Sequence, residues 1–151
     1  MTEPVRVYRS CVVDAPIEDV WGLVNSFNGL SLWHDGVKES RIEDEKGDNT
    51  IGGVRNVSLK ETTDSVRELL LAYDHLNHSY TYSMLSGMPL KNYVATMVLF
   101  PITETNQTLF VTKSEFVCPI NEREQWEQFV SGIYRRGFTS LQSKFPSKVT
   151  F

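Results

Sequence analysis

The chain has 151 residues, of which 40% are hydrophobic and 23% are charged, and it carries a formal net charge of -4 at pH 7. This length and composition are typical of one globular domain, so we expect a single domain over residues 1–151. The pI of about 5.4 and the lack of a basic stripe argue against a nucleic-acid partner.

Apolar runs in this sequence are short. Charged residues interrupt the first twenty positions, so the sequence predicts no secretory signal. The richest run, YVATMVLF at residues 93–100, has the length of a strand and not of a membrane span. Two cysteines, Cys11 and Cys118, are too few for a disulfide framework, so both are expected to be reduced. We therefore expect a cytoplasmic protein with no integral membrane association.

The first elements along the chain are a strand and two short helices. Residues 5–13 place mostly apolar side chains on one parity, which indicates a strand with one buried face. Pro16 suits the first turn of the helix that follows, and apolar residues at helical spacing continue as far as Phe27. An Asn-Gly pair breaks this helix, and LSLWHDG, residues 30–36, predicts a second short helix or turn.

The middle of the chain predicts strand after strand. They are expected over residues 37–45, 53–60, 65–73, 78–85, 92–102 and 110–117. Closely spaced strands joined by short turns favour an antiparallel sheet. Gly52 and Gly53 are interpreted as a bulge or tight bend where the sheet curves.

A long helix is expected from about residue 122 to 145, before Pro146. Asn121 and Glu124 are interpreted as a loose capping box at its start. Its apolar stripe comprises Trp126, Phe129, Val130, Ile133, Tyr134, Phe138, Leu141 and Phe145. A curved sheet of seven antiparallel strands wrapped around this helix would bury the stripe, which gives an α+β fold. Such an arrangement leaves a cavity where sheet and helix do not fully meet.

Arg55 and Glu68 interrupt the apolar face of the hairpin formed by residues 53–60 and 65–73. If the turn centres on residues 61–62, the two side chains face each other directly across the strands. Ionised groups are expensive to bury unless they pair, so two interpretations stay open. The pair could be an ion pair at the rim of the sheet. Alternatively, Arg55 orients a ligand oxygen or stabilises an oxyanion in a cavity, while Glu68 holds Arg55 or exchanges protons.

Several other side chains are candidates for the wall of that cavity. Tyr80, Tyr82 and Tyr93 offer hydroxyl groups to a ligand, although packing against the helix is the alternative for each of them. The remaining assigned binding residues are Phe110 and Thr112 on the last strand, and Phe129 and Ile133 in the middle of the helical stripe.

The three histidines give weaker signals. His34, in the segment WHDG, could reach the mouth of a cavity, but an ordinary loop position is the more common role for such a residue. His75 and His78 have no third ligand at a suitable spacing, so no metal site is expected. No phosphate-binding loop or catalytic triad is present as a motif, and no cofactor is expected.

The segments VVDAPIEDVWGLVNSFNGLSLWHDGV, GGVRNV, VRELL, YTYSM and LKNYVATMVLFP, followed by the long helix, together resemble the START-like superfamily. They are most similar to its small polyketide cyclase/dehydrase and lipid-transport proteins. The resemblance covers nearly the whole chain, and it implies a helix-grip fold in which the sheet holds the C-terminal helix around a hydrophobic cavity.

Two plant branches are similar over the middle section. In the lachrymatory-factor synthases an arginine and a glutamate of the cavity are the implicated pair, and the matching positions here are Arg55 in GVR and Glu68 in REL. The abscisic acid receptors carry a Ser-Gly-Leu-Pro-Ala gate where this chain reads LKETTDSV, and only half of their latch is matched by MPLKNY at residues 88–93. The resemblance therefore does not imply a hormone-gated switch.

These observations lead to three expectations for function. The first is the binding of a small hydrophobic or lipid-like molecule with a polar head, and the second is a cofactor-independent cyclase, dehydratase or isomerase that uses Arg55 and Glu68. The third is a protein-interaction module with a vestigial pocket, for which the sequence names no protein partner.

Overall fold

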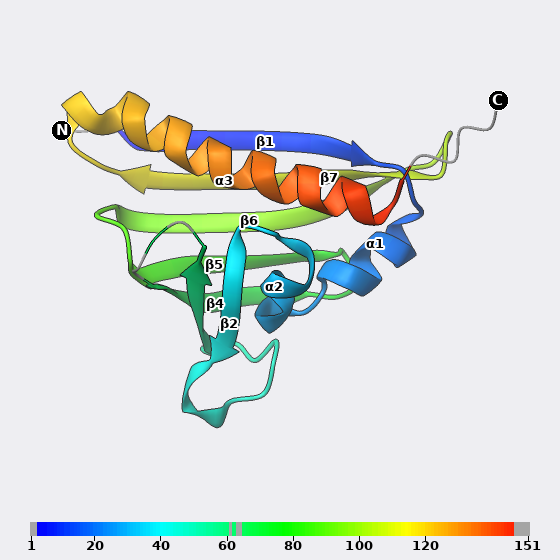
Figure 1. Ribbon diagram of the computed structural model, residues 1–151, viewed down its shortest axis with the longest axis horizontal. Coiled ribbons are helices and arrows are strands. Elements are labelled where there is room, and N and C mark those ends of the chain that lie inside the picture. Colours follow the sequence, from blue (N-terminus) through cyan, green and yellow to red (C-terminus); the bar gives the residue numbers. More distant parts are fainter. Residues whose placement is uncertain (1–2, 61, 63–64, 147–151) are drawn as a thin grey trace.

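The computed structural model describes residues 3–60, 62 and 65–146, and it contains one curved sheet and one long helix (Figure 1). The strands are β1 (Val5–Val13), β2 (Val37–Ile42), β3 (Val54–Leu59), β4 (Ser65–Asp74), β5 (Ser79–Ser86), β6 (Lys91–Ile102) and β7 (Gln107–Val117). The helices are α1 (Ile17–Val24), α2 (Leu30–Trp33) and α3 (Arg123–Lys144), and the 3-10 turns are η1 (Phe27–Gly29), η2 (Glu43–Glu45) and η3 (Ile120–Glu122). None of the described helices is long and apolar enough to cross a membrane.

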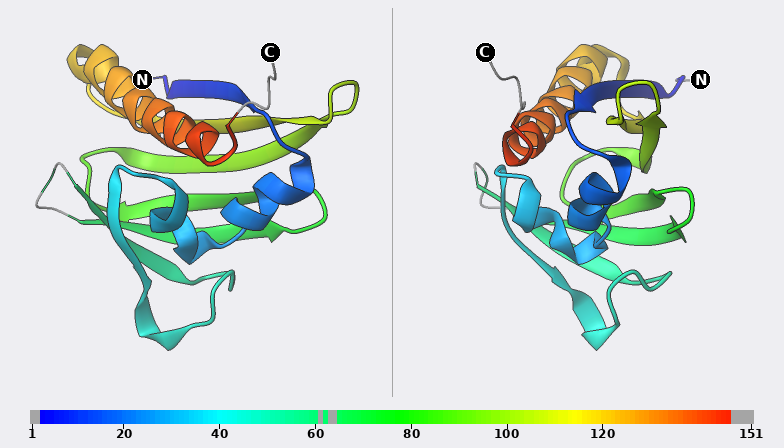
Figure 2. Two further views of the ribbon diagram at one scale, coloured as in Figure 1. Left: turned by 45° about the vertical axis from the view of Figure 1, so that its right-hand side comes forward. Right: turned by 90° about the vertical axis from the view of Figure 1, so that its right-hand side faces the viewer.

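The sheet has seven strands in the order β1-β7-β6-β5-β4-β3-β2, and every neighbouring pair is antiparallel. From β2 to β7 each strand therefore pairs with the next one along the chain, and β1 lies beside β7 at the far edge. Figure 2 shows the sheet curling, with α1, α2 and α3 on its concave side. This arrangement confirms the expected helix-grip fold, including the two short helices after the first strand.

Strand periodicity decides which side chains enter the space between sheet and helix. On β5, Tyr80 and Tyr82 are buried, whereas Ser79, Thr81 and Ser83 are only half-buried. Because successive side chains of a strand point to opposite faces, the tyrosines share the concave face. The same alternation applies to β3 and β4.

Helix α3 buries one face against the sheet and against α2. The buried face combines apolar residues with small ones, namely Val130, Ser131, Tyr134, Gly137, Phe138, Ser140 and Leu141. A Cβ at Gly137 would lie 2.7 Å from Cδ2 of His34, so only a glycine lets the end of α2 approach α3 this closely. Phe138 also packs edge-to-face on Phe110 of β7, with ring centroids 5.5 Å apart.

The start of α3 differs from the expected capping box. Residues 120–122 form the turn η3, in which the Glu122 amide donates to the Pro119 carbonyl at 2.9 Å. Glu122 precedes the first helical residue, and no side chain caps the helix. The proposed roles of Asn121 and Glu124 were therefore wrong, because a backbone turn started by Pro119 leads into the helix instead.

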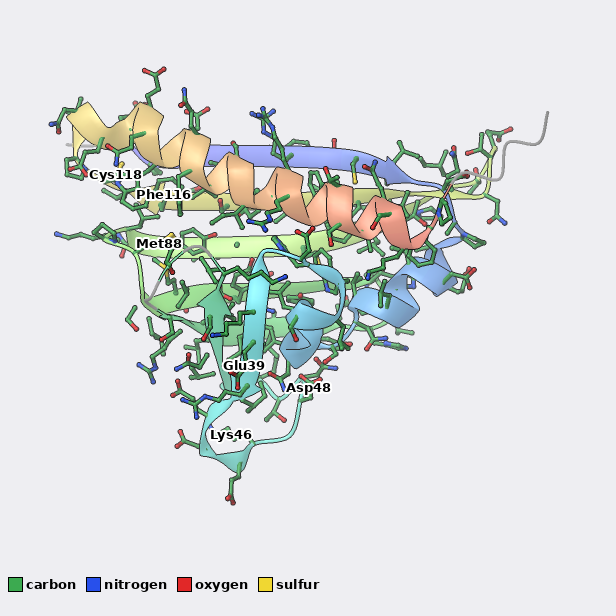
Figure 3. All side chains as sticks on the ribbon, viewed as in Figure 1. Glu39, Lys46, Asp48, Met88, Phe116 and Cys118 are labelled. Carbon is green, nitrogen blue, oxygen red and sulfur yellow. The ribbon has the colours of Figure 1, made fainter. Side chains whose placement is uncertain are left out.

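Strand β2 is shorter than expected, ending at Ile42 and not at residue 45. The next residues form η2, in which Asp44 has a φ of 60°. This turn brings the carboxylate of Glu43 to Arg67 of β4, which donates to it from Nε at 2.8 Å and from Nη2 at 2.7 Å. Figure 3 shows Lys46 and Asp48, from the β2–β3 connection, in a lobe away from α3.

Candidate functional site

A cavity of about 80 Å³ lies between the concave face of the sheet and α3. Side chains from β3 to β7 form one wall, α3 forms another, and α2 closes one end. Met88, from the β5–β6 connection, also lines it and lies beside β6 at the end of the sheet (Figure 3). A single water needs roughly 10–15 Å³ of such space, so this cavity can hold several waters or a small molecule.

Arg55 and Glu68 form an ion pair in the wall of this cavity. They are opposite each other in the β3–β4 register, and Arg55 Nε donates to Glu68 Oε1 at 2.8 Å. Arg55 is 2% exposed and Glu68 is 8% exposed. The predicted direct pairing is therefore confirmed, and the pair is buried beside the cavity and not placed at a solvent-exposed rim. The turn on which the register prediction depended includes residues 61 and 63–64, which lie outside the described residues.

Further contacts fix the guanidinium group of Arg55. Its Nη1 donates to the carbonyl oxygen of Phe27 at 2.7 Å, and its Cζ lies 4.2 Å from the centre of the Phe27 ring and 4.8 Å from that of Tyr82. Burial is the largest single influence and would lower the pKa of Arg55, but the charge and hydrogen bond of Glu68 together with the neighbouring Tyr80 and Tyr82 raise this pKa above its usual value. Arg55 is thus a fixed cation, with cation–π contacts to the rings of Phe27, Tyr82 and, at 5.9 Å, Tyr80.

Four tyrosines bring hydroxyl groups into the same region. Burial, with the charge of Glu68 as the second cause, raises the pKa of Tyr82 well above 10. Burial also raises the pKa of Tyr80, and it raises that of Tyr93 well above 10 and that of Tyr134 to about 12. The hydroxyl groups of Tyr93 and Tyr134 are 3.1 Å apart and share a hydrogen bond. All four are therefore neutral at ordinary pH and can both donate and accept hydrogen bonds.

His34 is a buried part of the cavity wall, at only 6% exposure, and not the ordinary loop residue that the sequence favoured. Its Nδ1 accepts a hydrogen bond from the Gly36 amide at 3.1 Å, and its Nε2 lies 3.0 Å from the Ile133 carbonyl oxygen. These two partners require a neutral ring with its proton on Nε2. Burial lowers the pKa of His34, which agrees with that state.

Most of the other candidates also reach the cavity. Tyr80, Tyr82, Tyr93, Phe110, Thr112 and Ile133 all line it. Phe129 does not. It is 41% exposed and packs edge-to-face on Trp126, with ring centroids 5.5 Å apart. Its assignment to the cavity is corrected for a geometric reason. Neighbouring helix positions lie about 100° apart, so when Val130 faces the core, Phe129 turns away from it.

Several wall residues were not assigned to the site from the sequence, among them Tyr134, Trp33 and Met97. Tyr134 belongs to the apolar stripe of α3, four residues from both Val130 and Phe138, and this spacing was a usable signal. Trp33 and Met97 line the cavity through the packing of α2 and β6, and no local pattern distinguished them from other core residues.

Comparisons with known proteins agree with this architecture. Residues 4–146 match the protein family described as polyketide cyclase/dehydrase and lipid transport. A protein of Nitrosospira multiformis is 24% identical, with a TM-score of 0.83 over 95% of this chain and 97% of that one. The XoxI protein of Bacillus cereus is 27% identical, with a TM-score of 0.82 over 93% and 95% of the two chains.

Norcoclaurine synthase of Thalictrum flavum, a point mutant in complex with a transition-state analogue, shares the fold at 15% identity. Its TM-score is 0.73, over 96% of each chain. This likeness supports the helix-grip architecture alone, whereas the family match supports the binding of hydrophobic ligands in general. Because that match spans nearly the whole chain, the protein belongs to the polyketide cyclase/dehydrase and lipid transport family.

Proposed function

We propose that the protein binds a small hydrophobic molecule with a polar end in the cavity between the sheet and α3. The observation that carries this proposal is the Arg55–Glu68 pair in an otherwise mainly apolar wall. Taking two charges out of water is costly, and apolar side chains of similar volume often stabilise a core as well or better. A cavity with a few buried polar groups has the composition of a small-molecule binding site.

The size of the cavity narrows the type of ligand. Pockets that enclose drug-sized ligands measure roughly 300–1,000 Å³, well above the value of about 80 Å³ found here. The present arrangement therefore fits a compound of about one ring, and a long lipid chain would require part of the wall to move. Met88 is the most adaptable candidate for such movement, because a methionine side chain has three rotatable bonds.

Native mass spectrometry of the purified protein tests this proposal, with extraction and identification of any bound molecule. A Val130→Phe variant fills the cavity from α3, where Val130 is 1% exposed, and it should abolish binding. The matched control is Val94→Phe on β6, at 40% exposure, which should leave binding intact. Circular dichroism must show that both variants fold. Equal retention of a bound molecule by both would place it outside the cavity.

A second function, cofactor-independent catalysis, is favoured by one observation. A carboxylate and several tyrosines with neutral hydroxyl groups line the same cavity, which is a suitable setting for proton transfer. Glu68 would move a proton and Arg55 would stabilise an oxyanion, although the contacts of Arg55 with Glu68 and Phe27 leave it less available. The protein should then convert a bound compound into a product of different mass or structure. Unchanged turnover by Glu68→Gln would exclude this role for the glutamate.

A further inference from the structure

The ion pair leaves one strong acceptor of the cavity wall unused. Glu68 Oε1 accepts from Arg55 Nε, whereas Glu68 Oε2 makes none of the hydrogen bonds found among the described residues. An ionised carboxylate oxygen can only accept a hydrogen bond. A ligand group at this position must therefore be a donor.

Arg55 is less available as an anchor for an anion than its residue type suggests. Its charge is already compensated by Glu68, its Nη1 is taken by the Phe27 carbonyl, and the rings of Phe27 and Tyr82 lie against it. A carboxylate in the cavity would lie near Glu68 and add an unpaired buried negative charge. An ammonium group would add an unpaired positive charge beside Arg55. Burying either unpaired charge in the cavity, away from water, costs free energy.

Tyr82 supplies the complementary group. It is two residues from Met84, the β5 partner of Glu68, so its side chain lies on the same face of the sheet. Its hydroxyl makes none of the hydrogen bonds found in the described part of the chain, in contrast to the paired hydroxyls of Tyr93 and Tyr134. A hydroxyl on the ligand can donate to Glu68 and accept from Tyr82 at the same time. A carboxylate or an ammonium can do only one of the two.

We infer that the cavity selects an uncharged compound of about one ring that carries a hydroxyl group, donating to Glu68 Oε2 and accepting from Tyr82. This inference rests on the proposed binding function. The ring itself would lie among the apolar and aromatic parts of the wall, which include Phe110, Phe138 and Met97.

The test uses four probes of nearly equal size: benzyl alcohol, toluene, benzoate and benzylamine. Isothermal titration calorimetry at pH 7 should show benzyl alcohol binding at least about thirtyfold more tightly than toluene, because toluene lacks both hydrogen bonds and one of these is to a charged group. It should also bind more than about tenfold more tightly than either charged probe, because each of these buries an unpaired charge. If benzoate, benzylamine or toluene binds best, this inference is overturned while the binding function stands. If no probe binds, the proposed function for a ring-sized ligand fails as well.

Two variants and one surface control sharpen the test. Tyr82→Phe should weaken benzyl alcohol about fivefold and leave toluene unchanged, whereas Tyr8→Phe on an exposed position should change neither. Glu68→Gln removes the counter-charge of Arg55 and should turn the preference toward benzoate. A Glu68→Gln variant that folds and still prefers benzyl alcohol to benzoate would contradict the charge argument. If that variant does not fold, the Tyr82→Phe measurement decides.

Discussion

Two arginine–glutamate pairs lie on opposite faces of the same hairpin. Arg55–Glu68 joins β3 to β4 on the concave face, with side chains that are 2% and 11% exposed. Arg67–Glu43 joins β4 to η2 on the other face, with side chains that are 41% and 20% exposed. The outer pair has the better geometry, since two nitrogens of Arg67 reach both oxygens of Glu43, whereas only one direct contact joins the inner pair.

The comparison shows that environment, more than geometry, decides what an ion pair contributes. Water screens the outer charges, so even a two-pronged contact stabilises the fold weakly. The inner charges have lost most of their hydration, so each depends on the other, and removal of either leaves an isolated buried charge. The outer pair therefore fastens η2 to the sheet, whereas the inner pair gives the cavity wall its polarity.

The largest expected effect is the loss of one inner partner. Glu68→Ala should lower the free energy of unfolding by about 3–5 kcal/mol, because it strands the guanidinium of Arg55 away from water. Urea denaturation followed by circular dichroism measures this change. Glu43→Ala, which removes the outer glutamate, is the matched control and should have a much smaller effect. Similar losses in both variants would show that burial does not distinguish the pairs.

Replacing the whole inner pair should have the opposite consequence. The double variant Arg55→Met/Glu68→Leu fills similar volume without charge, and it should match or exceed the wild-type stability by up to about 4 kcal/mol. Because the charged acceptor Glu68 is gone and only the Tyr82 hydroxyl remains, its preference for benzyl alcohol over toluene should fall. Urea denaturation and calorimetry of the same preparation check both points. If the double variant is as unstable as the single one, the pair is required by the fold itself.

A third buried polar group, His34, should make the stability of the fold depend on pH. Its pKa is lowered by burial, while Asp35 raises it and the charges of Arg136 and Arg55 lower it further. The unfolded chain therefore binds a proton at a higher pH than the folded chain does. Stability should fall as the pH drops below about 6.5 toward the folded pKa, with a slope of at most about 1.4 kcal/mol per pH unit.

His34→Gln is the variant that isolates this effect. The glutamine amide can still donate to the Ile133 carbonyl but does not titrate. Its midpoint in urea should therefore be less sensitive to pH between 6.5 and 5.5 than that of the wild type. An unchanged pH dependence would assign the effect to other groups.

The sequence was sufficient where the structure depends on local periodicity. Alternation along β3 and β4 and a turn at residues 61–62 placed Arg55 opposite Glu68, and the observed register agrees. The Phe27 carbonyl that accepts from Arg55 could not be predicted, because it comes from a 3-10 turn far away in the chain. His34 was undervalued for the same reason, since its partner on α3 is 99 residues away.

Helical periodicity was a coarser guide to the site. The stripe of α3 includes Val130, Ile133 and Tyr134, which all line the cavity, but only Ile133 of these was assigned to the site. Phe129, the other assigned residue of the stripe, is 41% exposed and does not line the cavity. Apolar character alone does not mark the edge of a buried helix face. That edge depends on where α2 and the sheet end, which only the assembled fold shows.

The smallest expected effect belongs to the outer pair. Hydrogen bonds from Arg67 hold the pKa of Glu43 at about 2, so its stabilising effect is present at neutral pH and is lost as the pH falls from about 4.5 toward 2. Arg67→Gln should remove this acid-sensitive contribution while leaving benzyl alcohol binding unchanged. In 1 M salt, where the screening length is roughly 3 Å, the stability difference between Arg67→Gln and the wild type should shrink further. If Arg67→Gln instead reduced ligand binding as strongly as Tyr82→Phe, the two faces of the hairpin would be coupled, and the separation of a structural pair from a binding pair would no longer hold.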